Sequence, residues 1–334
     1  MGSAHDIFSS EYPIMSASPI LSVVVTVVSD TAQSADLRHL QCCLEALERQ
    51  IDPPSLEVLV TCEANLPGIE ELEKRFPAVT FICVDRVRAP APEPSREHHD
   101  VLRGIGFRRA RGKLIASLED HDRPDPNWCA QLVKEHIQPY AAIGGAIENG
   151  IDRMMNWGVY FCDFGRYQNP LPSGPSTSAS DANVCYKREA LKSVCEAWDQ
   201  SYNETRVHAA LRAQGAIIAL SPRIIVYQHR LNLRLGPALL ERYVWARSYA
   251  AVRVASTRSL LRLVLLALCP VLPSVLVIRQ FMTVLRKGRN RGAFLRALPL
   301  TFLLDLVWAY GEFVGYLTGR AMSSFPVAKN EVHI

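Results

Sequence analysis

Four ionisable side chains in a row follow directly after the apolar segment 113–118: Glu119, Asp120, His121 and Asp122. Carboxylate oxygens and imidazole nitrogens bind divalent cations such as Mg²⁺ and Mn²⁺. A cation held in this way can neutralise the negative charge that develops on a leaving diphosphate. The same residues could equally form a solvated acidic turn before the next helix, and the cluster alone leaves both interpretations open.

The segments around this cluster alternate between strand and helix patterns. The predicted strands are apolar and rich in β-branched residues, as in buried parallel sheets, and cover 20–28, 56–62, 79–84 and 113–118. This order predicts an α/β domain with a doubly wound, mostly parallel sheet flanked by helices. Because ligands of open α/β sheets bind outside the carboxyl ends of the strands, we expect residues 119–122 at the binding edge.

Charge is distributed unevenly along the chain. Residues 1–241 carry 24 basic and 30 acidic residues, a balance of −6, whereas residues 242–334 carry 13 and 3, a balance of +10. The second part also contains the apolar segments 263–278 and 297–319. A basic, apolar tail favours contact with an anionic bilayer, through helices in the interface or a re-entrant hairpin. Two alternatives stay open: the segments span the membrane, or they are ordinary amphipathic helices packed on the domain. Nucleic acid is not expected as a partner, because aromatic and basic residues do not alternate as they do in base-stacking surfaces.

Four segments, taken together, resemble the family 2 glycosyltransferases, which have the GT-A fold. They are LRHLQCCLEALERQ, ARGKLIASLEDHDRPDPNW, SDANVCYKREAL and NETRVHAALRAQG, in the family's order. The resemblance runs from about Leu21 to Trp245. It implies an enzyme that transfers a sugar from a nucleotide-diphosphate sugar and uses a divalent metal, Mg²⁺ or Mn²⁺, as its cofactor.

The second of these segments looks like the family's D-x-D metal motif. Glu119 and His121 stand at its first and last positions, with Asp120 between them. A shift by one residue would use Asp120 and Asp122 instead, and the register stays open. The resemblance implies metal ligands among Glu119, His121 and Asp122, with Asp120 near the nucleotide-sugar.

The fourth segment resembles the stretch that supplies the family's catalytic base. Its spacing to Gly215 aligns Glu204 with that base, which would accept the proton of the acceptor hydroxyl and give inversion at the anomeric carbon. Glu204 could also be an acid that interacts with a helix dipole. Five further candidates for nucleotide-sugar binding, each of which could instead be an ordinary surface or turn residue, are Ser29, Asp30, Glu63, Arg103 and Asn183.

The segment ERYVWARSYA keeps only Trp245 of the Q-x-x-R-W motif of processive synthases. The resemblance therefore implies single additions to a glycan or lipid-linked acceptor, in the synthesis of cell-surface polysaccharide or glycoconjugate. Because Glu63, Glu119 and His121 depart from the family pattern, the alternative is a degenerate GT-A domain that binds a nucleotide or a partner at the membrane without catalysis.

The expected organisation has four parts: a flexible N-terminus (1–18), a GT-A glycosyltransferase domain (19–241), a membrane-associated helical tail (242–322) and a flexible C-terminus (323–334). The N-terminal residues do not show a charged segment followed by an apolar one, so secretion is not expected. With the membrane-associated tail, this predicts a location on the cytoplasmic face of the cell membrane.

Overall fold

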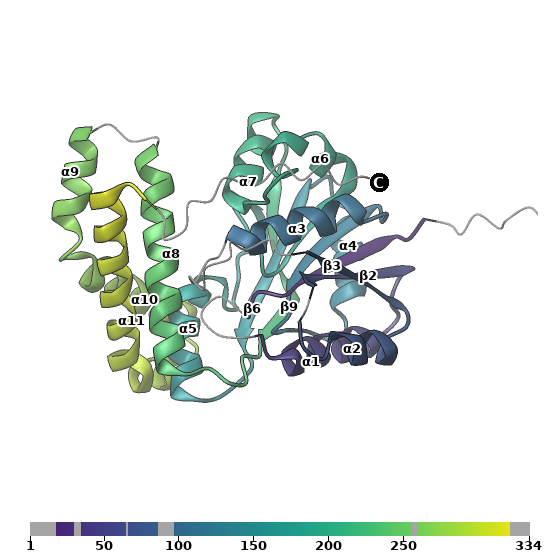
Figure 1. Cartoon of the computed structure of the whole chain (residues 1–334), viewed down its shortest axis with the longest axis horizontal. Helices are drawn as coiled ribbons and strands as arrows, with labels where there is room; N and C mark the ends of the chain where they lie inside the picture. The colour runs from purple at the N-terminus through teal and green to yellow at the C-terminus, as the bar shows by residue number, and fades with distance from the viewer. Residues whose placement is uncertain (1–17, 30–34, 65, 86–96, 256–258, 321–334) are drawn as a thin grey trace, which may run out of the picture.

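The computed structural model describes residues 18–29, 35–64, 66–85, 97–255 and 259–320. Figure 1 shows two parts side by side: a twisted sheet with helices on both of its faces, and a group of long C-terminal helices. The predicted flexible C-terminus, almost all of the predicted flexible N-terminus, and the candidate residue Asp30 lie outside the described residues.

A nine-stranded sheet forms the centre, in the order β3-β2-β1-β4-β8-β6-β9-β5, with β7 paired to β9. Its first four strands are parallel: β1 (Leu21–Thr26), β2 (Leu56–Glu63), β3 (Val79–Val84) and β4 (Leu114–Glu119). The others are β5 (Asp122–Pro124), β6 (Ala142–Asn149), β7 (Gly174–Ser176), β8 (Val184–Lys187) and β9 (Ile218–Gln228). Strand β8 runs antiparallel to both of its neighbours, whereas β6 and β9 are parallel to each other.

Successive side chains of β1 pack against different sets of helices. Val23 and Val25 belong to the core formed with α1 (Leu37–Glu48), α2 (Ile69–Arg75) and α4 (Trp128–Glu135). Val24 belongs to the core formed with α3 (Glu97–Arg109), α6 (Arg188–Lys192) and α7 (Glu204–Ala213). A strand buried on both faces is what the continuous β-branched run predicts, and the predicted α/β class, with a mostly parallel sheet flanked by helices, is confirmed.

Four long helices follow the sheet and pack beside α5 (Met154–Asp163): α8 (Leu235–Ala255), α9 (Ser259–Leu268), α10 (Leu272–Lys287) and α11 (Arg291–Thr318). Helix α11 lies directly against α8, because two of its contact positions are glycines. A Cβ at Gly311 would lie 2.7 Å from the Tyr243 carbonyl oxygen, and one at Gly315 would lie 2.6 Å from that of Arg247. Helix α8 runs unbroken through residues 241 and 242, where the sequence pattern places a boundary.

One helix of the described residues, α11, is long and apolar enough to cross a membrane, and 44% of its most apolar window is buried within the protein. Helices α9 and α10 pass the same test only as a pair, and they are bent by 73° at the break between them. The predicted apolar segments 263–278 and 297–319 fall on this bent pair and on α11. Contact of the tail with a membrane stays a prediction.

Candidate functional site

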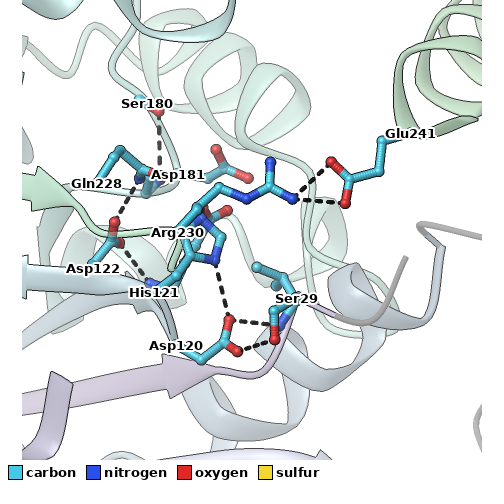
Figure 2. Close-up of polar contacts among 12 residues, drawn as sticks. Ser29, Asp120, His121, Asp122, Ser180, Asp181, Gln228, Arg230 and Glu241 are labelled. Atoms are coloured by element: carbon cyan, nitrogen blue, oxygen red, sulfur yellow. Dashed lines mark hydrogen bonds and ion pairs between the residues drawn. The ribbon is translucent and has the colours of Figure 1, made fainter. Parts of the chain in front are cut away.

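The side chains that follow β4 point in different directions (Figure 2). Glu119, His121 and Asp122 each offer one oxygen or nitrogen atom, and these atoms all lie within 4.8 Å of one another. The Asp120 carboxylate instead accepts hydrogen bonds from the Ser29 hydroxyl and from the Val28 backbone N–H. Asp120 thus fixes the chain after β1, and it contacts the three-residue candidate metal site through His121.

His121 lies between two carboxylates. Its Nε2 is 3.2 Å from Glu119 Oε2, and its Nδ1 is 3.3 Å from Asp120 Oδ1. Burial alone would lower the pKa of the imidazole, but the two carboxylates outweigh it and raise the pKa of His121 to about 10. Because a metal ligand must be deprotonated, binding of a cation by His121 would release a proton.

Asp122 is completely buried next to His121. Its Oδ2 accepts a hydrogen bond from the Glu119 backbone N–H at 2.8 Å, and its Oδ1 accepts one from Gln228 Nε2 at 2.5 Å. Burial, followed by the charge of Glu119, raises the pKa of the Asp122 carboxyl well above its usual value. A cation at this point would stabilise the carboxylate, so two carboxylates and one imidazole make a donor set that fits a divalent ion.

Helix α3 places Arg103 beside the same cluster. The guanidinium is buried and lies 2.8 Å from Glu119, 3.0 Å from Asp181 and 3.6 Å from Asp100. Burial by itself would lower the pKa of Arg103, but Asp181 and Glu119 raise it above its ordinary value. Arg103 therefore remains charged and orients Glu119 at the end of β4.

A cavity of about 920 Å³ lies beside the candidate metal site. The sheet part contributes Arg103, Glu119, His121, Asp181 and Glu204, and all four C-terminal helices contribute to the other side. This volume is within the range of sites that enclose small organic ligands, about 300–1,000 Å³. The structure therefore brings the predicted base, two candidate metal ligands and Arg103 to one cavity.

Glu204 is the first residue of α7, but the N-cap of this helix is Asn203. The Asn203 side chain accepts a hydrogen bond from the Arg206 backbone N–H and so caps the helix. Glu204 lies in the first turn, where the helix dipole favours a negative charge, and it also lines the cavity. Both interpretations of Glu204 given by the sequence are compatible with this position.

Five described candidate residues do not line the cavity: Asp120 and Asp122 of the cluster, and Ser29, Glu63 and Asn183. Ser29 is buried and donates to Asp120, and Glu63 is half-buried at the end of β2, opposite Val84 of β3. Asn183 is buried, and its amide is bonded to three other segments of the domain: Oδ1 accepts from Trp128 Nε1 at 3.0 Å, and Nδ2 donates to the carbonyl oxygens of Ala146 and Ile224 at 2.9 and 3.1 Å. Nucleotide-sugar binding by Ser29, Asp30, Glu63, Asp120 and Asn183 stays a prediction.

The structure adds two arginines that sequence reasoning did not identify. Arg230, just after β9, lines the cavity, and its Nη2 donates to both carboxylate oxygens of Glu241 of α8 at 2.7 and 2.8 Å (Figure 2). Arg242, the next residue of α8, is buried and pairs with Asp163 at the end of α5. The adjacent opposite charges at 241 and 242 are visible in the sequence, but their distant partners are not.

Comparison with known proteins defines the fold but not a family. No protein-family model matches the chain, and no curated protein matches its sequence. Solved structures do match, and this chain shares its fold with a glycosyltransferase among them. One of them is the mannosyltransferase PcManGT from Pyrobaculum calidifontis, in complex with GDP-Man and Mn2+, with a TM-score of 0.53 and 12% sequence identity. The match covers 91% of this chain and 88% of that chain, so it extends into the C-terminal helices.

Proposed function

We propose that the chain is a metal-dependent glycosyltransferase that moves a sugar from a nucleotide-diphosphate sugar to an acceptor hydroxyl. One observation carries the proposal: Glu119, His121 and Asp122 form a candidate cation site at the end of β4, beside a cavity that also contains Glu204. The shared fold with a mannosyltransferase whose structure contains GDP-Man and Mn2+ supports the same reaction class.

The residues of the cavity have complementary roles in this proposal. When bound, a divalent cation would supply positive charge next to the leaving diphosphate. Arg103 adds a fixed positive charge through its contact with Glu119. Glu204 accepts the proton of the acceptor hydroxyl while the hydroxyl oxygen forms a bond to the anomeric carbon. The bond from that carbon to the diphosphate oxygen breaks on the opposite side, and the nucleoside diphosphate leaves with the electron pair, so the anomeric configuration inverts.

The finer parts of the proposal come from the sequence. They are membership of family 2, single sugar additions, and a glycan or lipid-linked acceptor in the synthesis of cell-surface polysaccharide or glycoconjugate. The basic tail and the apolar helices α9–α11 support a location at the cytoplasmic face of the membrane.

The experiment is calorimetric titration of the full-length chain with UDP, GDP, CDP and dTDP, with and without Mn²⁺. We expect one nucleotide to bind in a metal-dependent manner. Asp122→Asn and His121→Ala should abolish this binding, because each removes a ligand of the candidate cation site. The matched control is Glu189→Gln, which changes an acid whose side chain is 85% exposed on α6 and should leave binding unchanged.

Absence of binding for every nucleotide, with the protein shown to be folded, would reject the transferase. It would favour the alternative, a degenerate domain that binds a partner at the membrane. The contacts of His121 with Glu119 and Asp120 would then form an ion-pair network with a structural role, and the cluster would not bind a cation. If binding occurs, Glu204→Gln should keep it but lower the rate of transfer by at least about 10²-fold, the usual contribution of a general base.

A further inference from the structure

The cavity beside the candidate metal site is formed by two parts of the chain. Apart from Arg230 and residues 161–167, the walls of its second part are made by the C-terminal helices, from Glu241 of α8 to Tyr316 of α11. This half of the cavity, which we call the helical half, does not contain the candidate metal ligands. What it binds is therefore not determined by the donor chemistry proposed above.

A buried polar cluster lies in the helical half. It consists of Arg242 on α8, Gln280 on α10 and Asp305 on α11, which are 5%, 8% and 0% exposed. Arg242 lies 3.7 Å from Asp305, and Gln280 Nε2 donates to Asp305 Oδ1 at 3.4 Å. Each of the three side chains nevertheless has one buried atom without a hydrogen-bond partner among the described residues: Arg242 Nε, Gln280 Oε1 and Asp305 Oδ2.

Buried polar atoms without a hydrogen-bond partner destabilise the folded protein. Apolar side chains of similar shape would make a more stable interface between these helices. Since all three residues also line the cavity, their free atoms are suited to bind a ligand that enters it.

The kinds of atoms in the cluster indicate the kind of ligand. Gln280 Oε1 and Asp305 Oδ2 are acceptors, whereas Arg242 Nε is a donor. One hydroxyl group can donate to one of the first two while it accepts from the third, and a second hydroxyl can donate to the other. A phosphate group offers only acceptors and would place its charge next to the Asp305 carboxylate. The cluster is therefore complementary to a head group that carries several hydroxyls, as a sugar does.

The wall next to this cluster is apolar. Leu265 of α9 and Leu272 and Leu276 of α10 line the same cavity. Away from the cavity, α9 and α10 expose further large apolar side chains, among them Leu263 at 62%, Val275 at 52% and Ile278 at 61%. An exposed apolar surface on a strongly basic tail is suited to an anionic bilayer. An apolar chain can pass from that bilayer along this wall.

We propose that the helical half is the acceptor site and that the acceptor is a membrane glycolipid. Its sugar head binds among Arg242, Gln280 and Asp305, and its apolar chain lies against Leu265, Leu272 and Leu276. This inference rests on the proposed transferase function and deepens it, because it selects a glycolipid over a free glycan and over a lipid whose head is only a phosphate.

The experiment measures binding of the full-length protein to three kinds of phosphatidylcholine vesicle: without addition, with monohexosyl diacylglycerol, and with phosphatidic acid. Free hexose is the fourth ligand. We expect binding at least tenfold tighter to glycolipid vesicles than to the other two, and weak binding of free hexose. Gln280→Leu should reduce the glycolipid preference about tenfold, the equivalent of one hydrogen bond of about 1.4 kcal/mol.

Gln280→Leu also separates a binding role from a structural one. The substitution removes one atom unpaired among the described residues, Gln280 Oε1, and one long hydrogen bond of 3.4 Å from Nε2 to Asp305 Oδ1, so the variant should stay folded with only a small change in thermal stability. The matched control is Gln138→Leu, an exposed glutamine outside the cavity, which should change neither glycolipid binding nor metal-dependent nucleotide binding.

Equal binding to phosphatidic acid and glycolipid vesicles would overturn the proposal in favour of a lipid phosphate. Equal binding of free hexose and glycolipid would overturn it in favour of a soluble glycan. A glycolipid preference that survives Gln280→Leu would move the head group away from this cluster and also overturn it. Failure of the transferase proposal is seen separately, as loss of metal-dependent nucleotide binding.

Discussion

Asn183 allows a structural role and a ligand-binding role to be separated quantitatively. Its amide makes three buried hydrogen bonds, to Trp128 Nε1, the Ala146 carbonyl and the Ile224 carbonyl. Asn183→Leu keeps the approximate volume but leaves all three partners unpaired. Each unpaired buried group costs about 1–3 kcal/mol, and the added apolar surface offsets part of this cost, so we expect a net loss of roughly 3–6 kcal/mol. Such a loss is a large part of the stability of a typical domain, about 5–15 kcal/mol.

The assay is urea denaturation followed by both circular dichroism and tryptophan fluorescence, with the dependence on urea compared between variants. Asn127→Ala is the matched control, because Asn127 is exposed and makes no side-chain cap to α4. It should change the free energy of unfolding by less than about 0.5 kcal/mol. A loss below about 1 kcal/mol in Asn183→Leu would refute the structural reasoning. If nucleotide binding fell at the same time, the sequence-based role for Asn183 would be supported instead.

Three further substitutions test other parts of the structure. Burial lowers the pKa of His208 to about 4, below the value of about 6.5 in the unfolded chain. The contribution of neutral His208 to the free energy of unfolding is therefore complete above pH 6.5, and about 3 kcal/mol of it is lost as the pH falls toward 4. In urea titrations at several pH values, His208→Gln should lose that much less stability in acid than the parent, and parallel curves of stability against pH would contradict this expectation. Gly106→Ala should lower the free energy of unfolding by about 1–3 kcal/mol, because its Cβ would lie 2.3 Å from Val24 Cγ1. Gly236→Ala is the control and should be neutral, since there is open space around Gly236. Equal melting temperatures of the two variants would contradict the close packing of α3 on β1. Arg103→Met should cost about 3–5 kcal/mol of stability, because it leaves no counter-charge beside the partly buried carboxylates of Glu119 and Asp181. Mn²⁺ should raise the melting temperature of this variant more than that of the parent, and an equal effect would argue against a cation near Glu119.

The sequence predicted well those features that depend on local patterns. Strand β1 is an uninterrupted β-branched run, and it is buried on both faces, as such runs are in parallel sheets. The leucines of α1 lie on the face that packs against the sheet, since Leu40, Leu44 and Leu47 are buried. Residues 119–122 follow a buried strand, and the parallel sheet places them at its carboxyl edge.

Features that depend on distant partners were not predictable in this way. Strand β8 has only four residues, and its place between β4 and β6 is set by antiparallel pairing across the sheet. The direction of Asp120 depends on the turn after β4, so the sequence left open which acids face the cation site. The partner of Arg242 is Asp163, 79 residues earlier, and no local pattern relates the two. Asp305 was visible as an acid in an apolar segment, but its role as a cavity residue needed the helix packing.

The unbroken helix α8 has a practical consequence for anyone who wishes to work with a shortened, more easily purified form of this protein. A cut at residue 241 or 242 would fall inside α8, which begins at Leu235, and would leave a helical stub at the new end. A cut before Leu235 would also remove Glu241, the partner of Arg230, and with it one wall of the cavity. The C-terminal helices that line the cavity are thus inseparable from the part that would be assayed. The full chain, rather than a truncated form, is the appropriate starting material.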